Sequence, residues 1–90
     1  MMKEKFALGQ TVSTRNAVQT LNPDDVRLAM GRHASGDWGD CCPEDWESNE
    51  DDLRNGERLL SVYHDRNGVT FWIITEWDRS VTTVLLPEDY

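Results

Sequence analysis

The most constraining feature of the chain is the dipeptide Asn67-Gly68, which separates two segments rich in β-branched and aromatic residues. These segments are residues 59–63 (LLSVY) and 69–75 (VTFWIIT). Such segments favour strands, and Asn-Gly between them favours a two-residue type I′ turn, because both residues tolerate positive φ. The turn predicts an antiparallel hairpin with five cross-strand pairs. The predicted pairs are Val62 with Ile73, Leu60 with Thr75, Tyr63 with Trp72, Ser61 with Ile74, and His64 with Phe71.

A third strand is predicted at residues 81–86 (VTTVLL), between a turn near residues 78–80 and Pro87, which cannot continue a paired strand. Alternation of side chains then gives the sheet two faces. The face expected to pack against helices consists of Leu60, Val62, Phe71, Ile73, Val84 and Leu86. The opposite face is also apolar, with Tyr63, Trp72, Ile74, Leu59 and Leu85. Unless the N-terminal segment or another subunit covers it, this face is an exposed patch, so Tyr63, Trp72 and Ile74 form an alternative interface for a homodimer or another partner.

Helix signals precede the sheet. Asn22 is a favourable N-cap and Pro23 suits the first helical position. The apolar face of the helix that follows consists of Val26, Ala29, Met30 and His33, at helical spacing. Pro43 starts another helix, which ends near Gly56 and has a narrow apolar side, so most of it must face water or a partner.

The residues before Asn22 carry weaker signals. Ser13 or Thr14 caps a short helix whose apolar positions are Ala17, Val18 and Leu21. The alternation of Phe6, Leu8 and Val12 suits a short extended segment or an edge strand.

The chain of 90 residues is the size of one small domain. We predict a single α+β domain over residues 1–90. Residues 1–56 are mainly helical, with a short N-terminal extended segment and two to three helices. These helices pack on a three-stranded antiparallel β-meander formed by residues 57–90.

The negative charge is concentrated in one segment. Between Asp37 and Asp52 there are eight acidic residues and no Lys or Arg, whereas nine acids balance nine bases elsewhere, so this segment accounts for the net charge of −8. Its acids are Asp37, Asp40, Glu44, Asp45, Glu47, Glu50, Asp51 and Asp52. On a helix, Glu44, Glu47 and Asp51 share one face, where like charges repel by a few tenths of a kcal/mol per pair.

This segment supports three readings. Carboxylates on a rigid helix can occupy a basic, nucleic-acid-binding groove of a partner, with Trp38 as an aromatic anchor within the acidic run. The same run can instead be a solvated helix face. A Ca²⁺ or Mg²⁺ site is the weakest reading, because the run lacks the ligand order of an EF-hand loop, and we expect no metal and no cofactor.

Other chemistry has less support. His33 lies on an apolar helix face, where a buried and hydrogen-bonded histidine is commoner than a catalytic base. Cys41 and Cys42 are adjacent, which suits neither a disulfide framework nor a zinc site with either histidine. The turn around Glu76 and Asp78 supports only a minor alternative, a small enzyme, and we expect no catalytic activity.

The net charge and the hydropathy limit the binding partners and the cellular location that we expect. A net charge of −8 disfavours direct binding to nucleic acid. No apolar stretch approaches the roughly 20 residues of a membrane span, and the start MMKEK lacks a signal-peptide core. We therefore expect a cytoplasmic protein that does not bind membranes.

Beyond these patterns, the order of several short strings is specific. The strings are 33–40 (HASGDWGD), 49–50 (NE), Gly56, 58–63 (RLLSVY), 72–76 (WIITE), 78–80 (DRS), 82–83 (TT) and 85–90 (LLPEDY). In these, the chain resembles a family of small acidic plasmid-related proteins carried by plasmids, prophages and integrative elements of bacteria. Cys41-Cys42 and Trp77 depart from that pattern, which argues against a general thiol role.

The resemblance carries over no functional residues, but it implies a context. Small acidic proteins of mobile elements often inhibit host defences, as anti-restriction and anti-CRISPR proteins do when they block nucleic-acid-binding machinery. The leading expectation is therefore an inhibitor of a nucleic-acid-targeting defence complex, which binds a basic surface of that host complex in the bacterial cytoplasm.

Overall fold

The computed structural model describes residues 3–90, so the first two residues of the predicted N-terminal segment lie outside it. The elements in chain order are β1 (Gln10–Ser13), α1 (Arg15–Thr20), α2 (Pro23–Ala34), α3 (Pro43–Asn55), β2 (Leu59–His64), β3 (Thr70–Thr75), β4 (Val81–Leu85) and the 3₁₀ helix η1 (Pro87–Asp89). The α+β prediction is confirmed. Among residues 3–90, no helix is long and apolar enough to span a membrane.

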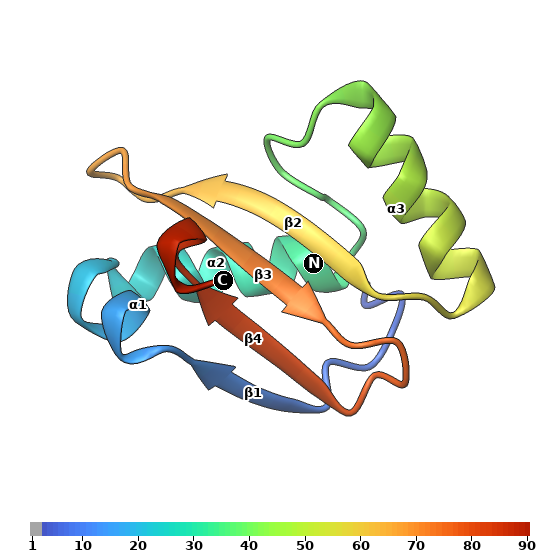
Figure 1. Ribbon diagram of the computed structural model, residues 1–90, viewed down its shortest axis with the longest axis horizontal. Helices are drawn as coiled ribbons and strands as arrows, with labels where there is room; N and C mark the ends of the chain where they lie inside the picture. The colour runs from blue at the N-terminus through green and yellow to red at the C-terminus, as the bar shows by residue number, and fades with distance from the viewer. Residues whose placement is uncertain (1–2) are drawn as a thin grey trace.

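The sheet has four strands in the order β1-β4-β3-β2 (Figure 1). The antiparallel meander of β2, β3 and β4 is confirmed. The predicted count of three strands is wrong, because the extended segment at Gln10–Ser13 joins β4 as a parallel edge strand. Backbone hydrogen bonds from Gln10 N to Ser80 O (2.9 Å) and from Thr14 N to Val84 O (3.0 Å) bracket this pairing.

The helices begin where their caps predict. The Thr14 hydroxyl accepts a hydrogen bond from Ala17 N at the start of α1, and the Asn22 side chain accepts two from Asp24 N and Asp25 N at the start of α2. Capping of this kind satisfies backbone donors that the first helical turn leaves free. In Figure 1, α2 crosses one face of the sheet and α1 lies at the end of β1.

The core lies between helices α1 and α2 and the face of the sheet that α2 crosses, which we call the inner face. Its buried members are Ala17, Leu21, Ala29, Tyr63, Phe71, Ile73, Val84 and Leu86. Phe71, Ile73, Val84 and Leu86 were predicted on this face, and their placement is confirmed.

The predicted register of the hairpin is wrong by one residue. Val62 lies opposite Trp72 instead of Ile73, Tyr63 opposite Phe71, and His64 opposite Thr70; Leu60 faces Ile74 and Ser61 faces Ile73. A shift of one residue exchanges the two faces of a strand. Leu59, Ser61 and Tyr63 therefore point into the core, and Leu60 and Val62, which were predicted there, point outward and are half-buried.

The turn explains the shift. Gly68 N donates to Asp65 O (2.9 Å) and Asp65 N donates to Val69 O (3.0 Å), so the loop holds three residues, with Gly68 at φ 79°. The buried Asp65 carboxylate accepts hydrogen bonds from Asn67 N and Val69 N. Asp65 thus starts a type I turn followed by a left-handed glycine, a geometry that competes with the predicted type I′ turn.

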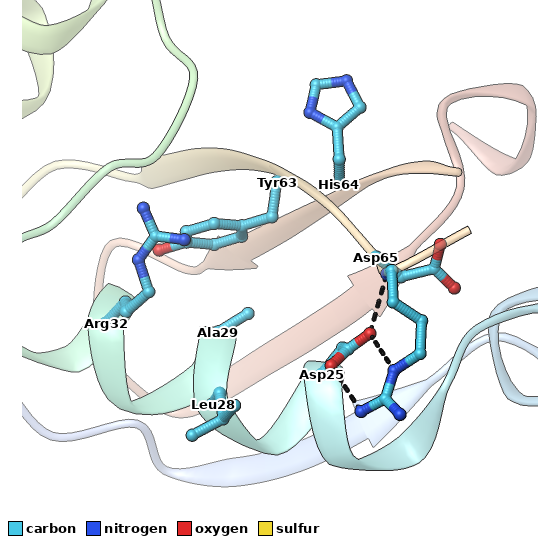
Figure 2. A pocket seen from close by; sticks show the side chains of 8 residues that line it. Asp25, Leu28, Ala29, Arg32, Tyr63, His64 and Asp65 are labelled. Atoms are coloured by element: carbon cyan, nitrogen blue, oxygen red, sulfur yellow. Dashed lines mark hydrogen bonds and ion pairs between the residues drawn. The ribbon is translucent and has the colours of Figure 1, made fainter. Parts of the chain in front are cut away.

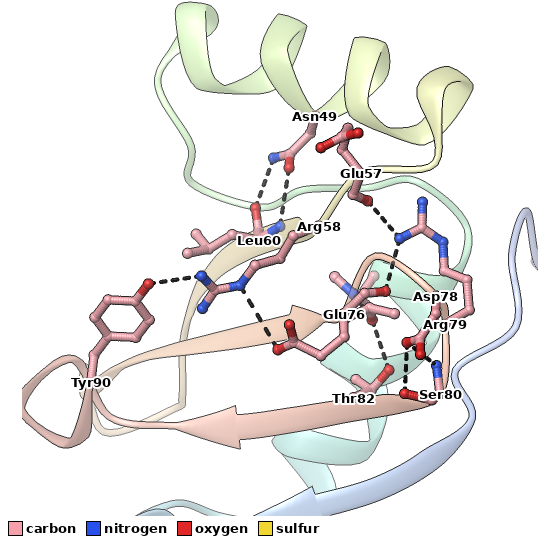
Figure 3. Close-up of polar contacts among 12 residues, drawn as sticks. Asn49, Glu57, Arg58, Leu60, Glu76, Asp78, Arg79, Ser80, Thr82 and Tyr90 are labelled. Carbon is pink, nitrogen blue, oxygen red and sulfur yellow. Dashed lines mark hydrogen bonds and ion pairs between the residues drawn. The ribbon is translucent and has the colours of Figure 1, made fainter.

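The predicted apolar patch on the outer face is wrong for four of its five residues, and the alternative interface within it for two of its three. Tyr63 and Leu59 are buried on the inner face because of the register shift, and Ile74 and Leu85 are only 2% and 5% exposed. Trp72 stays half-buried on the outer face, where the ring of Tyr90 packs edge-on against it at 5.6 Å. Arg58 lies over the Tyr90 ring and donates to its hydroxyl (2.9 Å), so the C-terminal residues partly cover this face (Figure 3).

A network of side-chain hydrogen bonds crosses the core. His33 is fully buried, with Nδ1 2.6 Å from Ser61 Oγ and Nε2 2.8 Å from Thr75 Oγ1. Thr75 Oγ1 lies 2.7 Å from Thr82 Oγ1, whose hydroxyl donates to Leu8 O (2.7 Å).

Leu8 O can only accept, so the Thr82 hydroxyl donates to it and accepts from the Thr75 hydroxyl. Thr75 must then accept from His33, so His33 carries its proton on Nε2. Ser61 then donates to the bare Nδ1. This confirms that His33 is a buried histidine with both ring nitrogens hydrogen-bonded. The same hydrogen-bond network connects Leu8, which precedes β1, to the sheet.

Candidate functional site

The acidic segment forms helix α3 and the loop that precedes it. Pro43 occupies the first turn of α3, Glu44 and Asp45 lie beside it, and Gly56 ends the helix in the left-handed conformation at φ 70°. Acids near a helix N-terminus are stabilised by the macrodipole, and glycine is the usual residue for this termination. Both ends of α3 therefore lie where the sequence predicts them.

Helix α3 lies beside β2, at the opposite edge of the sheet from β1 (Figure 1). Asn49 is its only buried residue. The Asn49 amide donates to Leu60 O (2.7 Å) and accepts from Leu60 N (3.1 Å), as a neighbouring strand would (Figure 3). Trp46 and Leu53 are half-buried, which confirms the narrow apolar side.

The solvent side of α3 carries the acidic row. Glu44, Glu47 and Asp51 follow helical spacing and are all exposed, as is Asp45. Asp51 forms an ion pair with Arg54 one turn later. Within residues 3–90, Glu44, Asp45, Glu47 and Asp52 have no ion-pair partner, so this part of the predicted acidic surface is not neutralised.

The loop acids differ from those on the helix. Asp37 accepts two hydrogen bonds from the guanidinium of Arg32, at 2.8 and 3.3 Å, and one from Gly39 N. The hydrogen bond from Arg32 is the main cause that holds the pKa of Asp37 below its usual range. Asp40 Oδ2 lies 2.6 Å from Nδ1 of His64. Both carboxylates have partners within the chain, and Arg32 offsets the charge of Asp37.

The prediction that Trp38 anchors an interface is wrong, because its side chain is 0% exposed. The ring stacks on Phe6 at 6.1 Å and meets His33 edge-on at 5.6 Å. Its Nε1 donates to Glu50 Oε1 (3.1 Å), so half-buried Glu50 holds the tryptophan in place.

Backbone pairing explains why Trp38 turns inward. Val62 N donates to Trp38 O (3.1 Å) and Asp40 N donates to Val62 O (2.7 Å), which places the loop alongside β2 as a short parallel bridge. Between the two contacts Gly39 adopts φ 74°, and a Cβ there would lie 2.0 Å from Val62 O. Only glycine fits this position without displacing the backbone.

The two thiols have different surroundings. Cys41 is half-buried, with Sγ 3.6 Å from Leu60 O, and burial is the largest cause that raises its pKa. A raised pKa keeps the thiol protonated and weakly nucleophilic. Cys42 is exposed at the N-cap of α3. No group of three metal-ligating side chains occurs in the part of the chain that the structure describes.

A hollow of about 280 Å³ lies between α2 and the end of β2. Figure 2 shows Arg32 over the Tyr63 ring, at 4.9 Å from its centroid. On the other side of the hollow Asp25 pairs with Arg66. The guanidinium of Arg32 is held by Asp37 and that of Arg66 by Asp25, so both cations are engaged by the chain's own carboxylates.

The turn around Glu76 and Asp78, predicted as a minor enzyme site, is held by hydrogen bonds and an ion pair within the chain (Figure 3). Asp78 accepts from Ser80 N and Ser80 Oγ, and Arg79 donates to the backbone oxygens of Glu57 and Glu76. Glu76 pairs with Arg58 at 3.9 Å. These side chains stabilise the turn between β3 and β4, where Arg79 has φ 60°.

Searches with the chain find no matching protein-family model, no matching curated protein and no matching solved structure. Function must therefore be argued from the chain's own surface, in which α3 is the most highly charged element.

Proposed function

We propose that the protein inhibits a nucleic-acid-targeting defence complex of its bacterial host by binding a basic, nucleic-acid-binding surface of that complex through α3. The supporting observation is the charge density along this helix. Residues 43–55 hold six acids and one arginine, and at 1.5 Å per residue the helix is about 20 Å long. That is one net negative charge per roughly 4 Å, close to the ~3.4 Å per charge of one strand of B-DNA.

The position of α3 supports the proposal. Its exposed acids lie on an element that contacts the rest of the chain through one narrow side, so the outward surface is accessible to a partner. The paired hydrogen bonds of Asn49 to Leu60 fix the helix against β2. A fixed row of carboxylates loses little conformational entropy when it binds, which favours affinity.

The chemistry explains which partner is favoured. A groove that binds phosphates presents Lys and Arg side chains in a row, and carboxylates at neighbouring helix positions, about 5–6 Å apart, can replace phosphates as their partners. Association between such surfaces is fast at low salt and weakens as salt rises. The resemblance to proteins of mobile elements favours a host defence complex among the basic partners.

The test compares the wild-type protein with the triple variant Glu44→Lys/Glu47→Lys/Asp51→Lys. Immobilised protein is used to capture partners from a lysate of a bacterial host at about 50 mM and about 500 mM salt. We expect wild-type protein to capture a nucleic-acid-binding complex and to inhibit its activity at low salt only, and we expect the triple variant to lose both properties.

The matched control is Glu4→Lys/Asp24→Lys/Glu88→Lys, which makes the same change in net charge at three exposed positions outside α3. It should retain capture and inhibition. Equal loss in both variants would mean that net charge alone matters. Undiminished inhibition by the α3 variant would contradict the proposal.

A further inference from the structure

One flank of α3 borders a hollow of about 530 Å³, a volume within the range of pockets that hold small ligands. Its lining consists of Cys41 from the loop before the helix and, from the helix itself, Pro43, Trp46, Glu47 and Glu50. Positions 43, 46, 47 and 50 follow the spacing of one helix face, so the hollow runs along α3. It includes Glu47, which also belongs to the exposed acidic row.

The ring of Trp46 supplies an aromatic wall for this hollow. Trp46 is half-buried, so part of its ring faces solvent. Among residues 3–90, no other ring packs against it, no guanidinium lies over it, and its Nε1 donates no hydrogen bond. Trp38, by contrast, contacts two rings and donates from Nε1 to Glu50. The exposed part of the Trp46 ring is therefore available to a partner.

Two carboxylates border the same hollow. Glu47 is exposed and has no ion-pair partner in the described part of the chain. Glu50 is half-buried, and the hydrogen bond that its Oε1 accepts from Trp38 fixes the side chain. Residues three positions apart on a helix have Cβ atoms about 5–6 Å apart, so the two carboxylates are neighbours. No Lys or Arg lines the hollow, which thus combines an aromatic wall with two negative charges.

We propose that this hollow binds an arginine side chain of the basic partner. The inference rests on the proposed function of α3, because it names the group of the partner that the helix receives. The methylene stem of an arginine can cover Pro43 and Trp46. Its planar guanidinium stacks on aromatic rings and binds carboxylates through paired hydrogen bonds. Arginine is also one of the residues that contribute most to binding at protein interfaces.

Charge complementarity selects this occupant. An apolar side chain over the hollow would take Glu47 and Glu50 out of water without a counter-charge, which is costly. A phosphate or a carboxylate would be repelled by both. A lysine supplies the charge, but its ammonium lacks the planar fork that pairs with carboxylate oxygens. A guanidinium therefore matches both the aromatic wall and the two carboxylates.

The first test titrates isotope-labelled protein with Nα-acetylarginine amide and follows the indole N–H signals by NMR. We expect the Trp46 signal to shift along a saturable curve, with a dissociation constant in the millimolar range. Trp77 is 66% exposed and does not line the hollow, so its signal is the internal control and should shift much less. The neutral isostere Nα-acetylcitrulline amide should leave both signals nearly unchanged, and Nα-acetyllysine amide should bind more weakly than the arginine derivative.

Two variants identify the groups that bind this probe. Glu50→Gln removes a charge and keeps an oxygen that can accept from Trp38 Nε1. Trp46→Leu keeps an apolar side chain and removes the aromatic face. Each should weaken binding about threefold or more, measured from the backbone amide signals of residues 47 and 50. The matched control is Glu44→Gln, which makes the same change in charge at an exposed position of α3 outside the hollow, and it should weaken binding less.

Equal shifts of the Trp46 and Trp77 signals would overturn the proposal. So would equally tight binding of the citrulline or the lysine derivative, or a loss of binding in Glu44→Gln as large as that in Glu50→Gln. These results are distinct from the test of the proposed function, which measures capture of a host complex. Failure here with capture retained would remove only the arginine site, whereas binding of the probe without capture would contradict the proposed function alone.

Discussion

Gly39 is a residue at which one added methyl group should strongly destabilise the fold. It lies in the loop that pairs with β2, at φ 74°, and a Cβ would lie 2.0 Å from Val62 O and 2.7 Å from the Tyr63 ring. We expect Gly39→Ala to lower the free energy of unfolding by about 3 kcal/mol, since it combines backbone strain with a steric conflict against main chain.

Gly31 provides the matched control for that substitution. It lies inside α2, where a Cβ would meet nothing within 4 Å. Gly31→Ala should raise the free energy of unfolding by about 0.5–1 kcal/mol, because alanine favours helix and loses less backbone entropy. Urea denaturation of both variants measures the two effects, and effects of the same sign would contradict the fold at one of these positions.

His33 should make the protein sensitive to mild acid. Burial is the main cause that lowers its pKa from 6.5 to about 3. The unfolded chain therefore binds a proton at His33 below pH 6.5, whereas the folded chain binds it only near pH 3. The contribution of His33 to stability is complete above pH 6.5 and is lost as the pH falls between these two values. Between pH 7 and pH 5 the loss should be about 2 kcal/mol.

Urea denaturation at pH 7 and pH 5 measures this contribution. His33→Gln should be less stable than wild type at pH 7, because the partners Ser61 and Thr75 lose their hydrogen bonds, but it should lose far less between the two pH values. His64→Gln removes the exposed histidine and is the control. An equal pH dependence in wild type and His33→Gln would show that His33 is not the group responsible.

Single residues also show how far the sequence reveals the fold. Asn67-Gly68 correctly indicates a hairpin, but the register depends on Asp65, whose carboxylate accepts from Asn67 N and Val69 N, and from Asn22 N outside the hairpin. The contact with Asn22 joins residues 43 positions apart. The turn itself is local, because Asp at the first position and Gly at the fourth favour a type I turn. The error of one residue therefore came from giving Asn67-Gly68 more weight than Asp65.

At the level of elements, Asn49 is expected to control the docking of α3. Asn49→Ala removes both hydrogen bonds to Leu60, which is half-buried, and leaves Leu60 O with only the weaker contact from Cys41 Sγ at 3.6 Å. We expect a loss of about 2–3 kcal/mol in the free energy of unfolding. Hydrogen exchange should also rise in α3 and at Leu60 before it rises in β3, because α3 is held to the sheet through few contacts.

Ser48→Ala is the control for this prediction, because Ser48 is the exposed neighbour of Asn49 on the same helix. It should leave exchange in α3 and the free energy of unfolding nearly unchanged. If Asn49→Ala accelerated exchange evenly throughout the sheet, α3 would not be a separately docked element.

Helices were easier to predict than strands because their signals are local. The proline and glycine positions that bound α3 and the Asn22 cap of α2 lie within a few residues of what they control. The parallel pairing of β1 with β4 joins Gln10 to Val81, about 70 residues away. No short-range pattern specifies that partner, so an extended segment was recognisable and its place in the sheet was not.

For the whole molecule, charge distribution is the property that the sequence predicted best. Four of the six acids of α3, namely Glu44, Asp45, Glu47 and Asp51, are exposed, as their helical spacing indicated. The loop acids Asp37 and Asp40 were predicted to join them, but Arg32 and His64 engage both. Arg32 comes from α2 and His64 from β2, so only the folded chain shows which acids have partners within it.

For the aromatic residues too, only the folded chain shows which side chains are exposed. Trp38 was predicted as an anchor because it lies within an acidic run, yet the backbone pairing of its loop with Val62 turns it into the core. Trp77 is the tryptophan that stays exposed, at 66% of its surface. Sequence position beside a turn is shared by both, and tertiary contacts separate them.

The central claim is that α3 occupies a surface that otherwise binds nucleic acid. The most direct measurement is a competition assay in which a labelled oligonucleotide binds the captured host complex while the protein is titrated in at low salt. The account predicts mutually exclusive binding, with competition by wild type and by Glu4→Lys/Asp24→Lys/Glu88→Lys, but not by Glu44→Lys/Glu47→Lys/Asp51→Lys. Simultaneous binding of the oligonucleotide and the protein to the complex would contradict it.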